Sequence, residues 1–147
     1  MKIINRTYHT EIILSFFTIS VSLLLLISCS RKLAFQVSPV VPAAEGVVKV
    51  KKDKNNNYNI DLSASRLADP SRLMPPRQMY IVWMETEQNG TKNIGQLKTS
   101  SGLFSSNLKS KLETVTPYKP TRFFITAEDD ARLQYPGGVM VLNTGGF

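Results

Sequence analysis

Histidine and cysteine are almost absent from this sequence. Its 147 residues include one His and one Cys, and only a single Trp. His9 precedes a long apolar run and Cys29 directly follows it, so a chain cleaved between the two keeps no histidine. Such a chain cannot build a Ser-His-Asp site, a Cys-His site or a Cys/His zinc site, and it cannot form an internal disulfide. We therefore predict no metal site, no cofactor and no histidine-based catalysis.

Long hydrophobic runs are also scarce, and the one that is present lies near the N-terminus. Lys2 and Arg6 precede an uncharged apolar stretch over residues 12–27, which ends at Ser28 and Cys29. A basic start, a short apolar region and a small residue are typical of an export signal. The run is shorter than the roughly 20 residues that span a membrane comfortably as a helix. We expect it to direct export.

The four residues that end this segment, Leu-Ile-Ser-Cys at 26–29, resemble the lipobox of bacterial lipoproteins. That resemblance implies cleavage before Cys29 and lipidation of its sulfur. Several acyl chains on one residue give a stable anchor, because each buried methylene contributes about 0.8 kcal/mol. The alternative is an uncleaved signal anchor in which Cys29 has no role. We predict a lipoprotein signal peptide over 1–28 and a lipid anchor at Cys29.

The residues after the cysteine bear on location and partners. Arg31 and Lys32 follow Ser30, and no Asp lies beside the cysteine. By resemblance to lipoprotein sorting in diderm bacteria, this favours the outer membrane, and the lack of an acidic stretch favours its periplasmic side. The net charge is +7, yet an exported lipoprotein is not expected to bind nucleic acid. The expected partners are the membrane, through the anchor, and an envelope protein.

A proline-bearing stretch and then short β-type segments follow the anchor. Residues 29–45 are predicted to be the lipidated cysteine and a flexible tether, because 33–45 is rich in small residues and proline. From 46 to 147, β-branched and aromatic segments alternate with turn residues. The predicted strands are 47–51, 58–64, 79–86, 93–98, 122–127 and 139–143, while 101–113 fits either a helix face or a strand. We predict an all-β domain over 46–147, an antiparallel β-sandwich of about seven strands.

The segment 79–86 is the strongest predicted strand. Large apolar residues occupy both of its alternating faces, so we expect a central strand covered on both sides. Trp83 lies on one face and Tyr80 on the other. Together with Tyr118 they could line a surface for a sugar or a peptide, but a tryptophan in a central strand more often lies in the core. We predict that Trp83 is a core residue.

Four motifs follow one another in an order known from one family. They are Tyr-Ile-Val-Trp-Met at 80–84, Gly-Gln-Leu at 95–97, Phe-Ile-Thr-Ala-Glu at 124–128 and Pro-Gly-Gly-Val-Met-Val-Leu at 136–142. As a set they resemble the C-terminal extracytoplasmic domain of the anti-sigma-K factor family, over roughly residues 58–143. The resemblance implies a sensor-like β-sandwich outside the cytoplasm. A sigma-binding domain is not part of it, so anti-sigma activity is not carried over.

Two groups of charged residues are candidate binding or catalytic sites. Lys49, Lys51, Lys52 and Lys54 surround a predicted hairpin turn and could contact an anionic surface such as lipid headgroups. More often such lysines stay solvated and protect an edge strand. The acidic clusters are Glu85 with Glu87, and Glu128 with Asp129 and Asp130. The second cluster could ligate Ca²⁺ through its oxygens, but no metal-binding spacing follows, and a solvated loop is the simpler interpretation.

Three functions remain open from the sequence. The favoured hypothesis is a membrane-anchored envelope lipoprotein that acts as a non-enzymatic interaction or sensory module. The alternatives are a carboxylate-using enzyme that acts on cell-wall glycan and a structural component of the envelope.

Overall fold

The computed structural model describes residues 30–99 and 109–147. Within these ranges the chain forms an antiparallel array of eight strands and one short 3₁₀ helix, η1 (Pro70–Arg72). The strands are β1 (Ser30–Ala34), β2 (Glu45–Lys52), β3 (Tyr58–Ser65), β4 (Met79–Thr86), β5 (Gly90–Thr99), β6 (Lys109–Thr116), β7 (Pro120–Glu128) and β8 (Val139–Asn143). Their order is β1-β2-β3-β6-β5-β4-β7-β8. The all-β prediction is confirmed.

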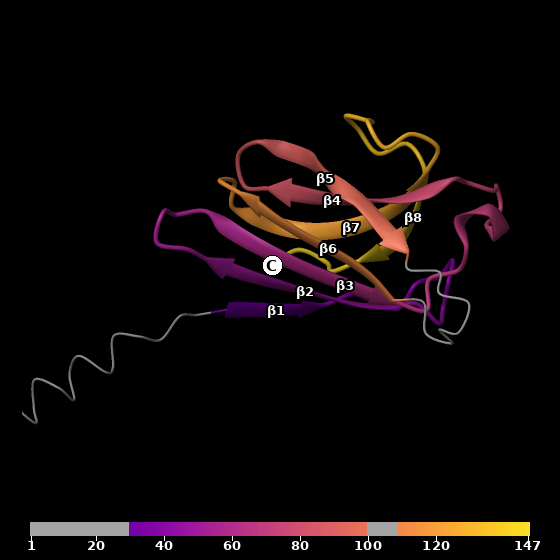
Figure 1. Ribbon diagram of the computed structural model, residues 1–147, viewed down its shortest axis with the longest axis horizontal. Helices are drawn as coiled ribbons and strands as arrows, with labels where there is room; N and C mark the ends of the chain where they lie inside the picture. The colour runs from indigo at the N-terminus through magenta and orange to yellow at the C-terminus, as the bar shows by residue number, and fades with distance from the viewer. Residues whose placement is uncertain (1–29, 100–108) are drawn as a thin grey trace, which may run out of the picture.

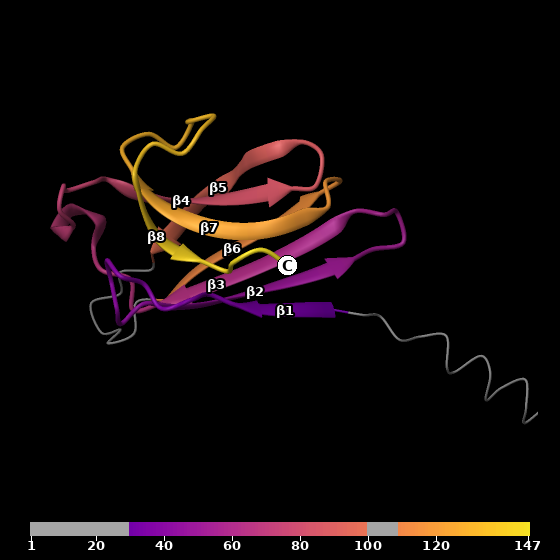
Figure 2. The ribbon, with the colours of Figure 1, turned by 180° about the vertical axis from the view of Figure 1, so that it is seen from behind.

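The array folds into two layers that face each other. One layer holds β1, β2, β3 and β6, and the other holds β5, β4, β7 and β8 (Figure 1). Strand β5 joins them, because it pairs with β4 along most of its length and with β6 only at Lys98 and Thr99. The view from behind shows the same two layers (Figure 2). This is the predicted sandwich, with one strand shared at the junction.

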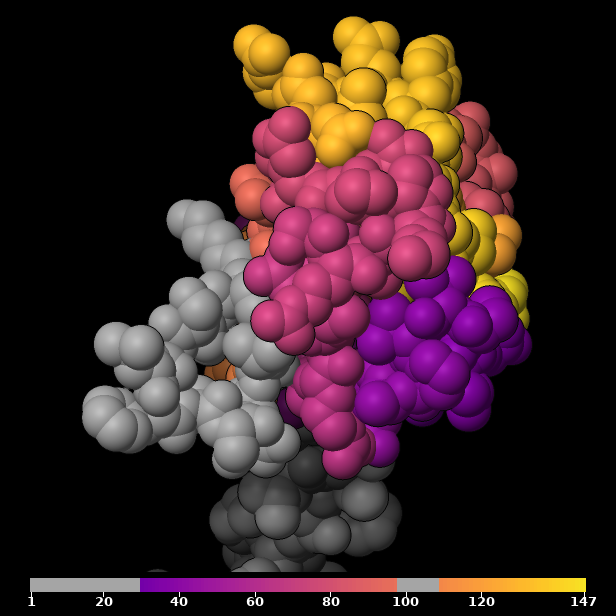
Figure 3. Space-filling model, turned by 90° about the vertical axis from the view of Figure 1, so that its right-hand side faces the viewer, coloured from indigo at the N-terminus to yellow at the C-terminus, as the bar shows by residue number. Residues whose placement is uncertain are grey.

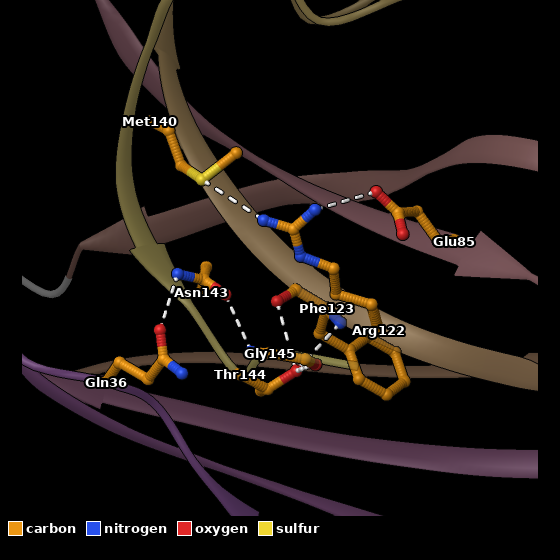
Figure 4. A network of polar contacts seen from close by, with 8 residues as sticks. All are labelled: Gln36, Glu85, Arg122, Phe123, Met140, Asn143, Thr144 and Gly145. Atoms are coloured by element: carbon orange, nitrogen blue, oxygen red, sulfur yellow. Dashed lines mark hydrogen bonds and ion pairs between the residues drawn. The ribbon is translucent and has the colours of Figure 1, made fainter. Parts of the chain in front are cut away.

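Hydrogen bonds also connect the layers on the other side, where β1 and β8 are the edge strands. Just after β1, the backbone N–H of Gln36 donates to the carbonyl of Asn143 at 2.8 Å. The Asn143 side-chain amide in turn donates to Gln36 Oε1 at 3.0 Å, as Figure 4 shows. Within that layer, the N–H of Thr144, the next residue, donates to the Phe123 carbonyl of β7. The segment after β1 therefore fastens the two layers together.

The main core fills the space between the layers. It contains the buried side chains of Tyr80, Val82 and Met84 from β4, together with inward residues of the other strands. The inward residues of β2 and β3 alternate with exposed or half-buried ones, as period-two segments require. Val48 and Leu62, register partners in these two strands, are fully buried. The burial explains why these segments form strands.

A smaller apolar cluster covers the opposite face of β4. Ile81, Trp83 and Phe124 are buried there, and Ala131 and Leu133 pack on them. The loop that carries Ala131 and Leu133 folds back over the sheet. The prediction that 79–86 is a central strand with both faces covered is confirmed, and a loop provides the second cover.

The predicted tether is wrong for residues 30–45. Residues 30–34 form β1, which pairs with β2 over five register positions. Further along, Ser38, Val41 and Ala44 are buried. The Ser38 hydroxyl accepts hydrogen bonds from the Val40 and Val41 N–H groups, which shapes the proline-bearing turn. Proline and small residues here mark a packed loop, so the folded domain includes residues 30–45 as well as 46–147.

Both predicted hairpins are present, and one ambiguous segment is resolved in part. The β2–β3 turn places Asn56 at a φ of +65°, a conformation that Asn tolerates. The β4–β5 turn places Gly90 at a φ of +66°, as an Asn-Gly turn requires. Of the ambiguous segment 101–113, residues 109–113 belong to β6 and 101–108 lie outside the described residues.

Candidate functional site

One end of the sandwich gathers positive charge. Strand β1 begins at this end, and the β2–β3 hairpin, the β6–β7 turn and the β4–β5 hairpin lie at the same end (Figure 1). We call it the basic end. Its cations are Arg31, Lys32, Lys51, Lys52, Lys54, Lys92, Lys119 and Arg122, and its carboxylate side chains are Asp53, Glu85 and Glu87.

Each carboxylate at the basic end already has its own partners. Glu85 accepts a hydrogen bond from Arg122 at 3.1 Å. Glu87 accepts one from Lys119 at 2.9 Å, and this bond raises the pKa of the Lys119 ammonium. Asp53 accepts the backbone N–H groups of the hairpin turn at 2.8 and 2.9 Å. Two of the eight cations, Lys119 and Arg122, are thus ion-paired, and Asp53 keeps its negative charge between Lys52 and Lys54.

The remaining cations are exposed. Among the residues that the structure describes, Lys51, Lys52 and Lys54 form no ion pair, and the same holds for Arg31. Lys51 is the register partner of Ser30, the first residue of β1. Cations that form no ion pair thus lie next to Ser30, the first residue that the structure describes.

Aromatic rings lie beside several of these cations. The Arg31 guanidinium is 4.7 Å from the centroid of the Phe147 ring, and Lys52 Nζ is 5.8 Å from that of Tyr58. Lys92 Nζ is 5.5 Å from the centroid of the Tyr118 ring, which is 38% exposed. A groove of about 190 Å³ runs between the Arg31, Lys52, Tyr58 and Phe147 side chains. The basic end therefore offers both cations and ring surface.

The opposite end of the sandwich, where three loops meet (Figure 3), differs in its charge pattern. Its arginines are mostly paired with nearby carboxylates: Arg66 with Glu45, Arg77 with Asp129 at 2.5 Å, and Arg132 with Asp130 at 3.2 Å. Hydrogen bonds from Arg132 hold the pKa of Asp130 below its usual value. Among the described residues, three arginines are thus ion-paired at this end, whereas two of the eight cations are ion-paired at the basic end.

The structure divides the four lysines that the sequence singled out. Lys51, Lys52 and Lys54 lie around the hairpin turn at the basic end. Lys49 is farther along β2, and its register partner on β3 is Asp61, which is itself opposite Glu113 on β6. Its register partner on β1 is Lys32, so Lys49 has a cation on one side and an acid on the other. It lies farther from the hairpin turn than Lys51, Lys52 and Lys54 do.

Sequence reasoning missed several members of the basic end. Arg31 was assigned to a tether, although Leu33 and Phe35 gave a short period-two signal after it. Lys92 and Phe147 come to this end only through the strand order, because they are distant in sequence from the hairpin. No local pattern in one sequence reveals such a juxtaposition.

The acidic cluster 128–130 divides into different roles. Glu128 is 3% exposed, so the expectation of a solvated loop is wrong for this residue. Its Oε1 accepts hydrogen bonds from the Gly137 and Gly138 N–H groups at 3.1 and 2.9 Å and from Thr126 Oγ1 at 2.6 Å. Trp83 Nε1 donates to the same Thr126 oxygen at 2.7 Å. Within the described ranges no group of His, Cys, Asp and Glu could hold a metal ion.

This buried network joins the motif residues that carried the family resemblance. Trp83, Thr126, Glu128 and Gly138 come from two neighbouring strands, β4 and β7, and from the turn before β8, and hydrogen bonds connect them in one chain. Each member of the network donates to or accepts from the next. Their role here is to hold the turn against the sheet.

The alternative of a binding surface made by Trp83, Tyr80 and Tyr118 is wrong. Trp83 and Tyr80 are buried on opposite faces of β4, as the core interpretation of Trp83 required, whereas Tyr118 is exposed at the basic end. Burial raises the pKa of Tyr80 to about 12, with a smaller contribution from Asp69. The Tyr80 hydroxyl donates to the Ala68 carbonyl at 2.8 Å.

Two candidate acids for glycan hydrolysis, Glu85 and Glu128, lie far apart. Arg122 is the register partner of Glu85, and Met79 is that of Glu128, on the same pair of strands. The six-residue offset corresponds to about 20 Å of strand. Paired glycosidase carboxylates lie about 5–10 Å apart. Glu85 and Glu128 therefore do not form such a pair, and Arg122 lies between Glu85 and Met140 in Figure 4.

A second concave surface lies toward the opposite end. It is a groove of about 600 Å³ on the outer side of β2, β3 and β6. Phe35, Val37 and Val47 contribute apolar walls, and Lys111 contributes a cation. Val37 is 81% exposed at its edge.

The predicted signal peptide over 1–28 and the lipidation residue Cys29 lie outside the described residues. Over the part of the chain that is described, no helix has the length and apolar character needed to cross a membrane.

Comparison with known proteins finds no matching family, no matching curated protein and no matching solved structure.

Proposed function

We propose that this protein is a lipid-anchored component of the bacterial cell envelope whose β-sandwich is a non-enzymatic interaction or sensory module. The anchor is Cys29, and the location is the outer membrane, facing the periplasm. The proposal includes the likeness to the extracytoplasmic domain of the anti-sigma-K factors, without a sigma-binding part.

The observation that carries the proposal is the position of the first strand. A lipobox ends at Cys29, and β1 begins at Ser30. Processing before Cys29 would therefore keep every described strand, and β1 would adjoin the lipidated residue. Such a chain retains the whole described sandwich, as expected if export and anchoring serve this domain.

The chemistry of the described acids favours a binding role over hydrolysis of glycan. Glu85 and Glu87 are engaged in ion pairs, and Glu128 is buried in a structural network. The groove of about 600 Å³, by contrast, is open to a partner in the envelope.

The anchor is tested by metabolic labelling with a fatty acid. Cys29→Ala is expected to accumulate as an unprocessed precursor without acyl label. Ser28→Ala is the matched control, because it keeps a small residue before the cleavage site and is expected to label normally. Normal labelling of Cys29→Ala would refute the assignment.

The interaction role is tested by crosslinking in intact cells. A photoreactive amino acid at Val37, at the edge of the groove, is compared with one at Glu113 on the outer face of the sheet. We expect one envelope protein to be captured from position 37 and to be lost in the Cys29→Ala background. Turnover of cell-wall glycan by the purified protein would instead establish the enzymatic alternative, and high abundance without any saturable partner would favour a structural component.

A further inference from the structure

We infer that the basic end is a second binding surface, which docks on the anionic phospholipid headgroups of the membrane that holds the anchor and so fixes the orientation of the sandwich. This inference rests on the proposed function, because it requires the lipid at Cys29. Its ligand class is the phospholipid headgroup.

The first argument is distance. Consecutive Cα atoms are about 3.8 Å apart, so Ser30 lies within about 4 Å of the lipidated residue. The headgroup region is about 5–8 Å thick on each side of a bilayer. Lys51 is the register partner of Ser30, and Lys52 and Lys54 follow it into the hairpin. The basic end is therefore held beside the headgroups without any flexible segment between.

The second argument is the charge pattern. Arg31, Lys51, Lys52 and Lys54 form no ion pair within the described residues. At the opposite end Arg66, Arg77 and Arg132 are each paired with a carboxylate. Each lysine near an anionic membrane strengthens association about fivefold. Arg72 and Lys111, toward the opposite end, also form no ion pair within the described residues, so unpaired cations are more numerous at the basic end. The basic end is also the end that the anchor brings to the membrane.

The third argument is the ring surface among these cations. Tyr58, Tyr118 and Phe147 lie at the basic end beside Lys52, Lys92 and Arg31. Aromatic side chains with a polar group favour the membrane–water interface. Lysines that only stay solvated and protect an edge strand do not need aromatic rings beside them.

Docking would direct the opposite end away from the membrane. Strand β2 has eight residues, which corresponds to about 26 Å at the usual rise of a strand. Val37 and the groove it borders would then be held at that height above the surface. The partner-facing part of the proposed module would be presented at a constant distance.

The test uses the full lipidated protein, purified from membranes and reconstituted into vesicles. The sulfur of a lipidated Cys29 is a thioether, so a single new cysteine can be labelled with a fluorophore. Asn55→Cys places the label at the basic end and Val37→Cys places it at the opposite end, both at exposed positions. Energy transfer to a headgroup-labelled lipid reports the distance of each label from the bilayer.

Two vesicle compositions and two charge variants complete the design. The vesicles contain phosphatidylcholine alone or phosphatidylcholine with phosphatidylglycerol. Lys52→Gln/Lys54→Gln neutralises the basic end. Arg72→Gln/Lys111→Gln removes the same charge from exposed residues toward the opposite end, and is the matched control.

We expect stronger transfer from position 55 than from position 37, and an increase at position 55 when phosphatidylglycerol is present. Lys52→Gln/Lys54→Gln should lower the ratio of docked to undocked orientations about 25-fold, at about fivefold for each lysine. The control pair should leave this ratio unchanged, and high salt should lower it because it screens exposed charge.

The outcomes separate the two proposals. Flotation of the protein with both kinds of vesicle reports the anchor. Flotation with equal transfer from both labels, or with no dependence on phosphatidylglycerol, would overturn the docking inference and leave the proposed function intact. An equal effect of the two double variants would also overturn it. Failure to float, with no acyl label, would overturn the proposed function and the inference together.

Discussion

The two adjacent glycines before β8 should respond very differently to alanine. A Cβ atom on Gly138 would lie 1.8 Å from the Ala127 carbonyl oxygen and 2.8 Å from Glu128 Oε2. A Cβ atom on Gly137 would meet only Glu128 Oε2, at 4.0 Å, which is an ordinary contact. Backbone atoms of β7 cannot give way by more than an ångström, so Gly138→Ala must displace the turn.

That displacement breaks the hydrogen bonds that the turn donates to a buried carboxylate. Hydrogen bonds to a charged group contribute about 1.5–3 kcal/mol each, and Glu128 accepts from both glycine N–H groups. We expect Gly138→Ala to lower the free energy of unfolding by about 3 kcal/mol, and the melting temperature by about 12 °C for a domain of this size. Gly137→Ala keeps both bonds and should change stability by less than about 0.5 kcal/mol.

Chemical denaturation followed by tryptophan fluorescence measures both changes, because Trp83 is linked to the same network through Thr126. If Gly138→Ala does not fold, Glu128→Gln provides the second measurement, since it keeps an acceptor oxygen and removes only the charge. We expect an intermediate loss from it. Equal stability of the two glycine variants would refute the packing argument, and an unchanged stability of Glu128→Gln would refute the role of the charge.

Three further predictions concern individual contacts. Thr126→Val should destabilise the domain by about 1–3 kcal/mol in urea denaturation, because it leaves the buried Trp83 N–H without an acceptor. Tyr80 stays protonated in the folded state up to about pH 12, whereas an unfolded tyrosine ionises near 10, so its contribution to stability is complete below pH 10 and is lost as the pH rises toward 12. Tyr80→Phe should abolish that alkaline loss, and tyrosinate absorbance should show one group that titrates late. Glu87→Gln should leave the unfolding midpoint unchanged, since its ion pair with Lys119 is solvent-exposed on both sides.

The strand pattern was predictable because burial imposes it. Segment 58–65 alternates between core and surface, and segment 79–86 is buried on both faces. In each case the order of apolar and polar residues reflects which side chains are buried, so the strand can be recognised from its sequence. The turn residues were equally local: Asn56 and Gly90 lie where a positive φ is needed. These features depend on neighbours in the chain, and a single sequence contains them.

The error over residues 30–45 has a physical origin. Proline and small residues favour an extended backbone, and the same backbone serves a tether or an edge strand with a packed loop. What decides between them is burial of Ser38, Val41 and Ala44 against distant parts of the chain. Likewise, nothing local indicates that Glu128 is buried, because its partners at 137 and 138 arrive through the β7–β8 connection.

A strand and a packed loop in place of the predicted tether change what an anchor at Cys29 would do. A flexible segment over 33–45 would span about 20 Å and would let the domain adopt many orientations. Instead β1 is paired with β2, and Gln36 is bonded to Asn143 in the other layer, so a lipid beside Ser30 is attached to both layers of the sandwich. The anchor then limits orientation as well as location. This restriction on orientation depends on the short connection between the lipid and the paired strand β1. A glycine-serine linker inserted between Cys29 and Ser30 should therefore remove the restriction and leave the fold and the cations unchanged. Any partner that requires the groove at a constant height above the membrane would lose affinity in such a variant, whereas one that only requires membrane location would not.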